Sequence, residues 1–392
     1  PLRVKMLPTT RFSLIAAIAL GIALLPTPLD AQRTPAEKDA ALLRLLESKL
    51  LHEGKQPVHN FMLYAENEAA GYVFHEGVGI VGRDETPIDA DYQYNIASIT
   101  KTFVAVVVLQ LAEEGVLDLQ DKAAAYLEAY DYLDMDEVHR YEGVSYGRAI
   151  TIGQLLRHTS GLADIFTDAE TRFTLSVLLH KKRQYDIERV VRLYFKYKLH
   201  KKAHFSPGEG YHYSDMNYHL LGMLIEQATG TTLAAQIRQR ILAPLGMEHT
   251  YFIYYEPERG HGKRIDAYLN KINVTKKINT SYEYGGGGLV STTQEQARFI
   301  QALFRGELFQ HASTLEAMMD CSATESHSGA YGYGLSKYEL DGQILYGHGG
   351  FYGSLLLYQP EQRITLAINA GQANVPFDAA EVVGEILRIL EE

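Results

Sequence analysis

The chain has 392 residues, of which 46% are hydrophobic and 22% are charged, and its formal net charge is −11. This composition is that of an ordinary globular protein with ample material for a core. The acidic balance argues against a nucleic-acid partner, because phosphate binding needs a cationic surface.

The first predicted element is an export signal. Three basic residues precede an apolar run over residues 12–25, and PTPLDAQ follows the run. A basic region, an apolar region and small residues in this order are typical of a cleavable secretory signal peptide. We therefore expect a signal peptide over residues 1–31, cut after Ala31, and a periplasmic or secreted mature protein over residues 32–392. The apolar run is too short to span a bilayer comfortably, so no stable membrane span is expected after cleavage.

Hydrophobic periodicity predicts the next elements. Apolar residues recur at helical spacing over residues 34–53, and alternating stretches at 60–65 and 71–82 predict strands. A strongly apolar helix starts at Ser98 and ends near Gly115, which suits the left-handed backbone at a helix C-terminus.

Residues 118–245 have a mostly helical pattern, interrupted by predicted loops at 140–150, 158–168 and 203–216. A basic run from His180 to His204 falls in this region. A solvated helix face is the simpler interpretation of the run, and docking of an anionic substrate or surface is the alternative.

Strand patterns return near the C-terminus, and a final amphipathic helix is predicted over residues 378–391. The predicted strands are Tyr331–Leu340, Gln343–Tyr346, Gly353–Gln359 and Arg363–Asn369. Strands at both ends of the chain predict an α+β fold with one antiparallel sheet built from the N- and C-terminal segments and flanked by helices. A mostly helical region, roughly 118–285, is inserted in its middle.

The segment SITK places Ser98 and Lys101 one helical turn apart on the same face. A serine hydroxyl becomes a nucleophile when a base lies within hydrogen-bond reach. Burial among the valines that follow disfavours the ammonium form of Lys101 and lets its amine serve as that base. The helix N-terminus adds positive potential, and the Ser98 N–H provides half of an oxyanion hole.

A second candidate, Tyr213, lies in a loop just before another apolar helix. A phenol near a lysine ammonium is more easily ionised, so Tyr213 can shuttle a proton between Ser98 and the leaving group. The alternative is that Tyr213 is simply one of the 27 tyrosines, on a surface loop.

The third candidate segment is YGHGGFYGS. His348, Gly349 and Gly350 lie at a predicted sheet edge, where glycines allow a substrate backbone to pair with the strand. The Phe351 N–H completes the predicted oxyanion hole. A purely structural histidine is the alternative for His348.

Taken together, these segments resemble the serine β-lactamase and penicillin-binding-protein superfamily, in its class C β-lactamase, D,D-peptidase and esterase branch. The resemblance covers most of the mature chain and includes SITK, ITIGQLLRHTSGL, FSPG…YSD, ILAPLGMEHTYF and GGGLVSTTQEQARF. It implies an acyl-serine hydrolase in which Ser98 attacks a carbonyl while Lys101 and Tyr213 move protons. It also implies that the Ser98 and Phe351 amides hold the oxyanion, and that His348 lies near the substrate's carboxylate.

Two departures from the family pattern affect substrate choice. Asp215 stands where the family usually has asparagine, and an ionised carboxylate cannot donate a hydrogen bond to a substrate amide. It also favours the charged form of Lys101. A literal Tyr-x-Asn at Tyr268 to Asn270 is an alternative second motif, although it lacks the loop-then-helix context. His-Gly-Gly replaces Lys-Thr-Gly, and both departures favour peptide or ester substrates over penicillins.

No cofactor or metal is expected, since His158, His212 and His219 show no ligand spacing along the chain. The prediction is therefore an exported serine hydrolase that acts on small amides, D-amino-acid peptides or esters. The alternatives are a class C-like β-lactamase and a weakly catalytic penicillin-binding or sensor protein. The sequence leaves the oligomeric state open.

Overall fold

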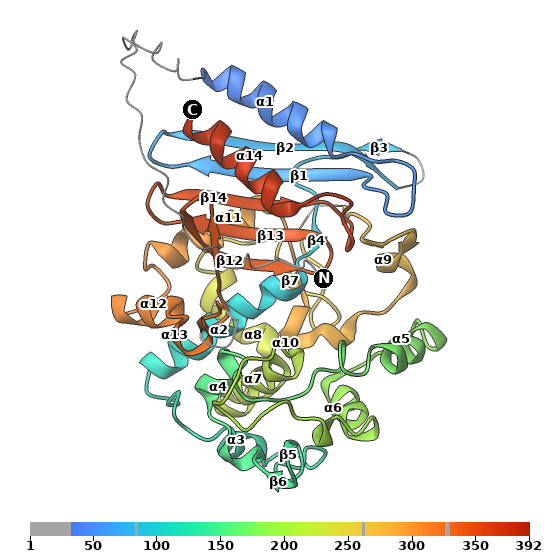
Figure 1. Ribbon diagram of the computed structural model, residues 1–392, viewed down its shortest axis with the longest axis vertical. Helices are drawn as coiled ribbons and strands as arrows, with labels where there is room; N and C mark the ends of the chain where they lie inside the picture. The colour runs from blue at the N-terminus through green and yellow to red at the C-terminus, as the bar shows by residue number, and fades with distance from the viewer. Residues whose placement is uncertain (1–32, 83–84, 261–262, 326–329) are drawn as a thin grey trace, which may run out of the picture.

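In a computed structural model, which describes residues 33–82, 85–260, 263–325 and 330–392, strands from both ends of the chain share one antiparallel sheet (Figure 1). Its strand order is β11-β12-β13-β14-β1-β2-β3. The N-terminal strand β1 pairs with the last strand, β14, from Met62 opposite Asn369 to Asn67 opposite Ile364. The predicted α+β fold is therefore confirmed. The seven strands are β1 (Asn60–Asn67), β2 (Tyr72–Val81), β3 (Thr86–Pro87), β11 (Ser336–Leu340), β12 (Gln343–Gly350), β13 (Ser354–Gln359) and β14 (Ile364–Asn369).

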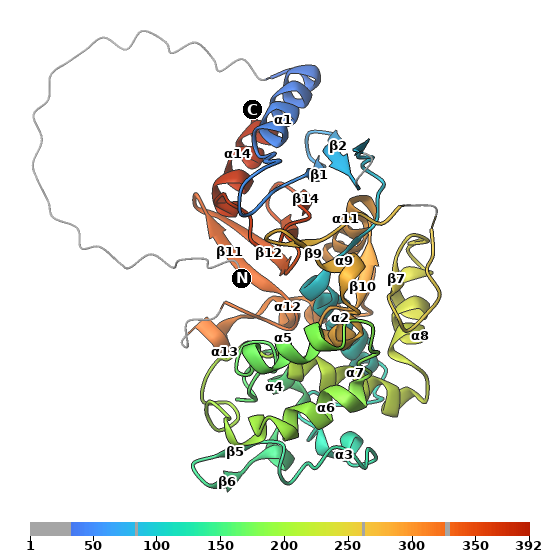
Figure 2. The same ribbon diagram turned by 90° about the vertical axis from the view of Figure 1, so that its right-hand side faces the viewer.

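Helices cover both faces of the sheet. The terminal helices α1 (Pro35–Ser48) and α14 (Ala379–Glu391) pack on one face, and α11 (Thr293–Phe304) packs on the other (Figures 1 and 2). Strand β14 is buried along its whole length because both of its faces are covered. Its side chains, such as Ile364 and Leu366, join those of α1 and α14 in one apolar cluster.

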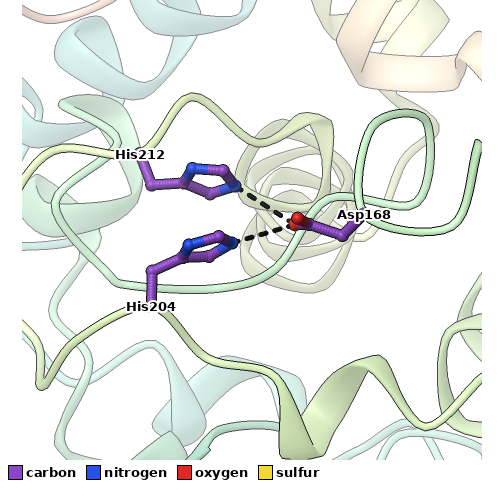
Figure 3. A group of neighbouring side chains, drawn as sticks. All are labelled: Asp168, His204 and His212. Atoms are coloured by element: carbon purple, nitrogen blue, oxygen red, sulfur yellow. Dashed lines mark hydrogen bonds and ion pairs between the residues drawn. The ribbon is translucent and has the colours of Figure 1, made fainter.

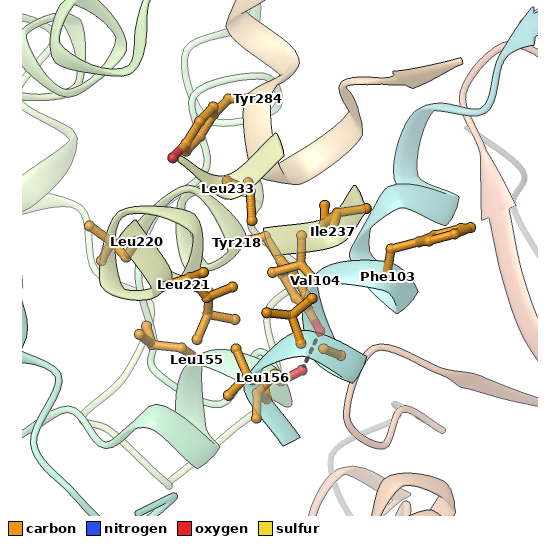
Figure 4. Close-up of a cluster of buried hydrophobic side chains, with 14 of the residues drawn as sticks. Phe103, Val104, Leu155, Leu156, Tyr218, Leu220, Leu221, Leu233, Ile237 and Tyr284 are labelled. Carbon is orange, nitrogen blue, oxygen red and sulfur yellow. Dashed lines mark hydrogen bonds between the residues drawn. The ribbon is translucent and has the colours of Figure 1, made fainter. Parts of the chain in front are cut away.

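Below the sheet, a helical region is organised around α2 (Thr100–Glu113) and α7 (Asp215–Thr229) (Figure 1). Figure 4 shows their side chains in a buried cluster, in which the Tyr218 hydroxyl donates to the Leu156 carbonyl oxygen at 2.8 Å. The other helices described are α3 (Ala124–Leu127), α4 (Ile152–Leu156), α5 (Glu170–Leu179), α6 (Ile187–Lys196), α8 (Leu233–Ile237), α9 (Val274–Lys277), α10 (Tyr284–Gly287), α12 (Ala312–Met319) and α13 (Ser322–Glu325). Shorter turns of helix are η1 (Ala97–Ile99), η2 (Gly147–Ala149), η3 (Leu199–Lys201), η4 (Arg238–Leu242) and η5 (Ser281–Glu283).

Within the described residues, short strands form three small sheets beside these layers. Strand β10 (Leu289–Ser291) lies between β4 (Tyr94–Asn95) and β7 (Tyr251–Phe252), and two hairpins complete the set. The hairpins are β5 (Arg140–Tyr141) with β6 (Val144–Ser145), and β8 (Tyr268–Leu269) with β9 (Ile272–Asn273). The first hairpin lies in the segment 140–150 that we expected to be a loop, where turn residues allow a brief pairing.

Element ends differ from the predictions where tertiary contacts override the pattern. The first helix ends at Ser48 rather than at residue 53, because Leu51 instead forms a β-bridge with Val58. The predicted strand from residue 331 begins only at Ser336. Gly115 has φ +70°, as expected for the residue that ends the apolar helix.

The predicted signal peptide lies outside the described residues. Within the part of the chain that the structure describes, no helix is long and apolar enough to cross a membrane.

Candidate active site

Ser98 lies on a short turn that leads from β4 into α2. The α-helix begins at Thr100, so Ser98 belongs to the preceding 3₁₀ turn, Ala97–Ile99, rather than to the α-helix that we expected it to open. Ala97 has φ +47°, a conformation that an alanine adopts only under constraint from its surroundings. The side chain of Ser98 is partly exposed at this turn, so a substrate can reach its hydroxyl.

Lys101 is fully buried, and its amine has an acceptor for each of its three N–H bonds. These acceptors are Ser98 Oγ at 3.1 Å, Asp215 Oδ1 at 2.5 Å and the Gly286 carbonyl oxygen at 2.7 Å. The spacing of three residues therefore brings the serine and the lysine together as the sequence indicates. A buried ammonium persists only with such partners, because desolvation of an unpaired charge is costly.

Asp215 occupies the first turn of α7, where the helix dipole favours a carboxylate. Its backbone N–H donates to Asp164 Oδ1 at 3.0 Å, and its own Oδ1 holds Lys101. The expected contact between Asp215 and Lys101 is therefore present, and the role of Asp215 in substrate binding stays a prediction. Position 286 requires a glycine, since a Cβ there would lie 2.5 Å from Asp215 Oδ1.

Tyr213 lies beside both proposed reaction partners. Its ring centre is 4.9 Å from Lys101 Nζ, and its buried hydroxyl is next to Ser98 without a hydrogen bond of normal geometry among the residues described. Burial, and then the negative charge of Asp215, raise the pKa of Tyr213 well above 10, although Ser98 opposes them. The expectation of easier ionisation was therefore wrong, because desolvation outweighs the nearby ammonium. Tyr213 is a neutral phenol that can relay a proton.

His348 is buried and neutral. Burial, followed by the positive charge of Lys101, lowers the pKa of His348 to about 3. Its Nδ1 lies 2.7 Å from the Gly349 carbonyl oxygen, which can only accept, so Nδ1 carries the proton and Nε2 accepts from the Tyr331 hydroxyl at 3.0 Å. The resemblance placed His348 near a substrate carboxylate, but a neutral imidazole engaged at both nitrogens supplies no counter-charge for one.

The end of β12 approaches the nucleophile's turn. A Cβ at Gly350 would lie 2.2 Å from the Ile96 carbonyl oxygen, so glycine is needed for this close approach. Strand β11 pairs with β12 only as far as Gly347, and β12 continues to Gly350. Gly349 and Gly350 therefore extend past the outermost strand, and the exposed Phe351 follows in the turn to β13. The role of the Phe351 N–H in an oxyanion hole stays a prediction.

The alternative second motif, Tyr268 to Asn270, makes its hydrogen bonds with another part of the chain. The Tyr268 N–H donates to the Gly371 carbonyl oxygen, and the Asn270 N–H donates to Gln372 Oε1. The lysine amine instead contacts Asp215, so the loop before α7 supplies the residues beside Ser98 and Lys101.

Two buried acids near the site were missed from the sequence. Burial and the charge of Asp215 raise the pKa of Asp164 to about 7. Burial raises the pKa of Glu283 to about 8, although a hydrogen bond from the Tyr352 hydroxyl opposes the shift. Glu283 Oε2 is buried and has no hydrogen-bond partner within the described ranges. No motif in the sequence marks either acid.

His158, in contrast, is a structural residue that braces the loop before α7. It is fully buried, and its Nδ1 lies 3.2 Å from the Ser214 N–H and 2.9 Å from Asn217 Nδ2. Its ring packs 4.3 Å from that of Tyr213. His158 therefore fixes the loop that carries the tyrosine.

The chain is similar to known proteins over most of its length. The family model described as Beta-lactamase matches residues 61–388. The penicillin-binding protein 4* of Bacillus subtilis is 27% identical over 317 residues, which make up 76% of this chain and 65% of that protein. The protein flp of Staphylococcus aureus is 25% identical over 286 residues, 71% of this chain and 52% of that protein. The chain thus spans between about half and two thirds of the length of these curated relatives.

Solved structures share the fold over nearly the whole chain. A D-stereospecific amidohydrolase from Streptomyces sp. has a TM-score of 0.70 and 26% identity, covering 89% of this chain and 97% of that one. The D-amino acid amidase of Ochrobactrum anthropi SV3, solved with L-phenylalanine, has a TM-score of 0.73 and 20% identity, covering 90% and 98%.

Proposed function

The chain belongs to the Beta-lactamase family, and on this premise we propose that it is an exported serine hydrolase that forms an acyl-enzyme on Ser98. The observation that carries the proposal is the 3.1 Å hydrogen bond between Lys101 Nζ and Ser98 Oγ, made by a fully buried amine. The basic and apolar N-terminal sequence supports export.

In the proposed reaction, Ser98 Oγ attacks the substrate carbonyl carbon and its proton passes to the neutral form of Lys101. Tyr213 then donates its hydroxyl proton to the leaving group and regains one from Lys101. The Ser98 and Phe351 N–H groups stabilise the oxyanion of the tetrahedral intermediate. Water then attacks the carbonyl carbon of the acyl-serine and gives a proton to Lys101 and Tyr213. These residues return a proton to Ser98 Oγ as the acyl group leaves.

We propose small D-amino-acid amides or peptides as the substrate class, with esters as the nearest alternative. The neutral His348 offers no positive charge for the carboxylate of a penicillin, and Asp215 offers no side-chain donor for its amide while ionised. The similarity to the Streptomyces amidohydrolase supports the same choice. The extension of Gly349 and Gly350 past β11 suits an extended substrate backbone.

A second candidate is a penicillin-binding or sensor protein that acylates slowly. The observation favouring it is the ion pair between Lys101 and Asp215, because it stabilises the ammonium form that cannot accept the Ser98 proton.

One substrate panel separates these functions. The mature protein is assayed with D- and L-phenylalanine amide, D-alanyl-D-alanine peptides, p-nitrophenyl esters and nitrocefin, beside Ser98→Ala. Turnover of the D-amide in preference to the L-amide, lost in Ser98→Ala, is the expected result. Covalent labelling by a fluorescent penicillin without turnover of any substrate supports the sensor, and fastest turnover of nitrocefin contradicts the proposed substrate class.

A further inference from the structure

A second polar cluster lies beside the active-site loops and has no part in the proposed reaction. His204 Nε2 and His212 Nε2 both point to the same oxygen of Asp168, at 3.0 and 3.2 Å (Figure 3). The two imidazole rings are stacked with centres 3.5 Å apart, and the three ligand-type atoms lie within 4.8 Å of one another.

The backbone fixes both histidines in this arrangement. The His204 N–H donates to the Gly161 carbonyl oxygen at 2.9 Å, and the His212 N–H donates to the His158 carbonyl oxygen at 3.0 Å. Gly161 has φ +78°, and a Cβ there would lie 2.2 Å from the Phe205 carbonyl oxygen, so only glycine allows the two loops to approach this closely. The ligand set is therefore held in place by two separate loops.

These atoms match the coordination chemistry of zinc. Ligands about 2.0–2.1 Å from a tetrahedral Zn²⁺ are separated from each other by about 3.3 Å, close to the observed oxygen–nitrogen distances. Two imidazoles and one carboxylate leave the fourth position open for water, and two nitrogen ligands disfavour Mg²⁺ and Ca²⁺. The side chains are only partly buried, at 34%, 23% and 21% exposure for His204, His212 and Asp168, so an ion can enter.

We propose that Asp168, His204 and His212 form a binding site for a divalent transition-metal ion, with Zn²⁺ as the best match. The spacing of the ligands along the chain hid this site, because Asp168 lies 36 and 44 residues before the two histidines. We expected His212 not to be a ligand because we used only the spacing of the histidines along the chain.

The proposed ion would lie at the end of a hydrogen-bonded chain that leads to the nucleophile. Asp168 Oδ2 accepts the Asp164 N–H at 2.7 Å, and Asp164 Oδ1 accepts the Asp215 N–H at 3.0 Å. Asp215 in turn holds Lys101. An ion bound to Asp168 would thus join the loop over 158–168 to the loop that carries Tyr213, and would stabilise the positions of the residues around Ser98.

The simpler alternative is that the histidines only donate hydrogen bonds to Asp168.

Titration of the metal-free protein distinguishes these two possibilities. The chain is purified without a histidine tag, treated with EDTA, and titrated with Zn²⁺ by calorimetry and with Co²⁺ by visible absorption. We expect one Zn²⁺ per chain, the intense absorption of tetrahedral Co²⁺, and a zinc-dependent rise in Tm by mass action. In each of the variants His204→Asn and His212→Asn, the affinity for Zn²⁺ should fall by about 100-fold or more, because one of the three protein ligands is lost.

The exposed His180 supplies the matched control, since it lies outside the cluster. His180→Asn should bind Zn²⁺ as the wild type does. Absence of Zn²⁺ binding in the wild type, or binding that survives in both His204→Asn and His212→Asn, would overturn the proposal. Asparagine can still donate a hydrogen bond, so both variants are expected to fold, and circular dichroism checks this.

Discussion

Replacing Asp215 by asparagine should accelerate acylation of Ser98, because it removes the negative charge that stabilises the Lys101 ammonium. The carboxylate oxygen lies 2.5 Å from Lys101 Nζ, and the two side chains are 14% and 0% exposed. With charge centres about 3 Å apart and an effective dielectric of about 20, the attraction is roughly 5 kcal/mol before desolvation.

Only part of this energy will appear as a lower barrier to acylation. If a quarter to a half of it does, the second-order rate constant for acylation by a fluorescent penicillin should rise by about 10- to 70-fold, since about 1.4 kcal/mol is a factor of ten. The burst of p-nitrophenol from a p-nitrophenyl ester provides an independent measurement.

Two further variants at position 215 separate charge from hydrogen bonding. Asp215→Ala removes the charge without adding an amide donor and should also accelerate acylation, whereas Asp215→Glu keeps the charge and should not. Unchanged or slower acylation in a folded Asp215→Asn protein would refute the argument, and would indicate that the carboxylate helps to accept the Ser98 proton.

Three other variants test separate features of the site. Tyr213→Phe should lower kcat/KM by about 10²–10³-fold with little change in Tm, because its hydroxyl relays a proton but lacks a normal hydrogen bond; a loss smaller than threefold would contradict the relay. Glu283→Gln should flatten the pH dependence of stability. Because the pKa of Glu283 is about 8 in the folded protein, its carboxyl group contributes fully to the free energy of unfolding below about pH 4.5. This contribution is lost as the pH rises through 8. The variant should therefore gain about 4 kcal/mol in free energy of unfolding relative to the wild type between pH 5 and 9 in urea unfolding, and parallel curves would argue against a protonated Glu283. Gly286→Ala should lower Tm, because its Cβ would lie 2.5 Å from Asp215 Oδ1, and a wild-type Tm would show that the carboxylate moves without cost.

The strands of the sheet could be predicted from the sequence, because the alternation of apolar residues that marks a strand is a local pattern. Alternation of apolar residues marked β1 and β2, and the strands near the C-terminus were found within a few residues of their ends. The sequence also placed the N- and C-terminal segments in one sheet, but the pairing of β1 with β14 is known only from the structure. The short hairpin at Arg140–Ser145 carries too few residues for a pattern to emerge.

Within the candidate site, the sequence brought Ser98 and Lys101 together because their spacing alone sets their geometry. The ionisation of Tyr213 and His348 was not predictable in this way, since it depends on burial by residues far away in the chain. The raised pKa values of Asp164 and Glu283 were not predictable either, because they arise from tertiary packing rather than from any motif.

Intact-protein mass spectrometry after reaction with a fluorophosphonate probe shows whether Ser98 is the nucleophile. We expect a single adduct on the wild-type chain, mapped by peptide digestion to Ser98 and absent from a folded Ser98→Ala protein. An adduct of equal yield in Ser98→Ala, or one mapped to another residue, would contradict the assignment of Ser98.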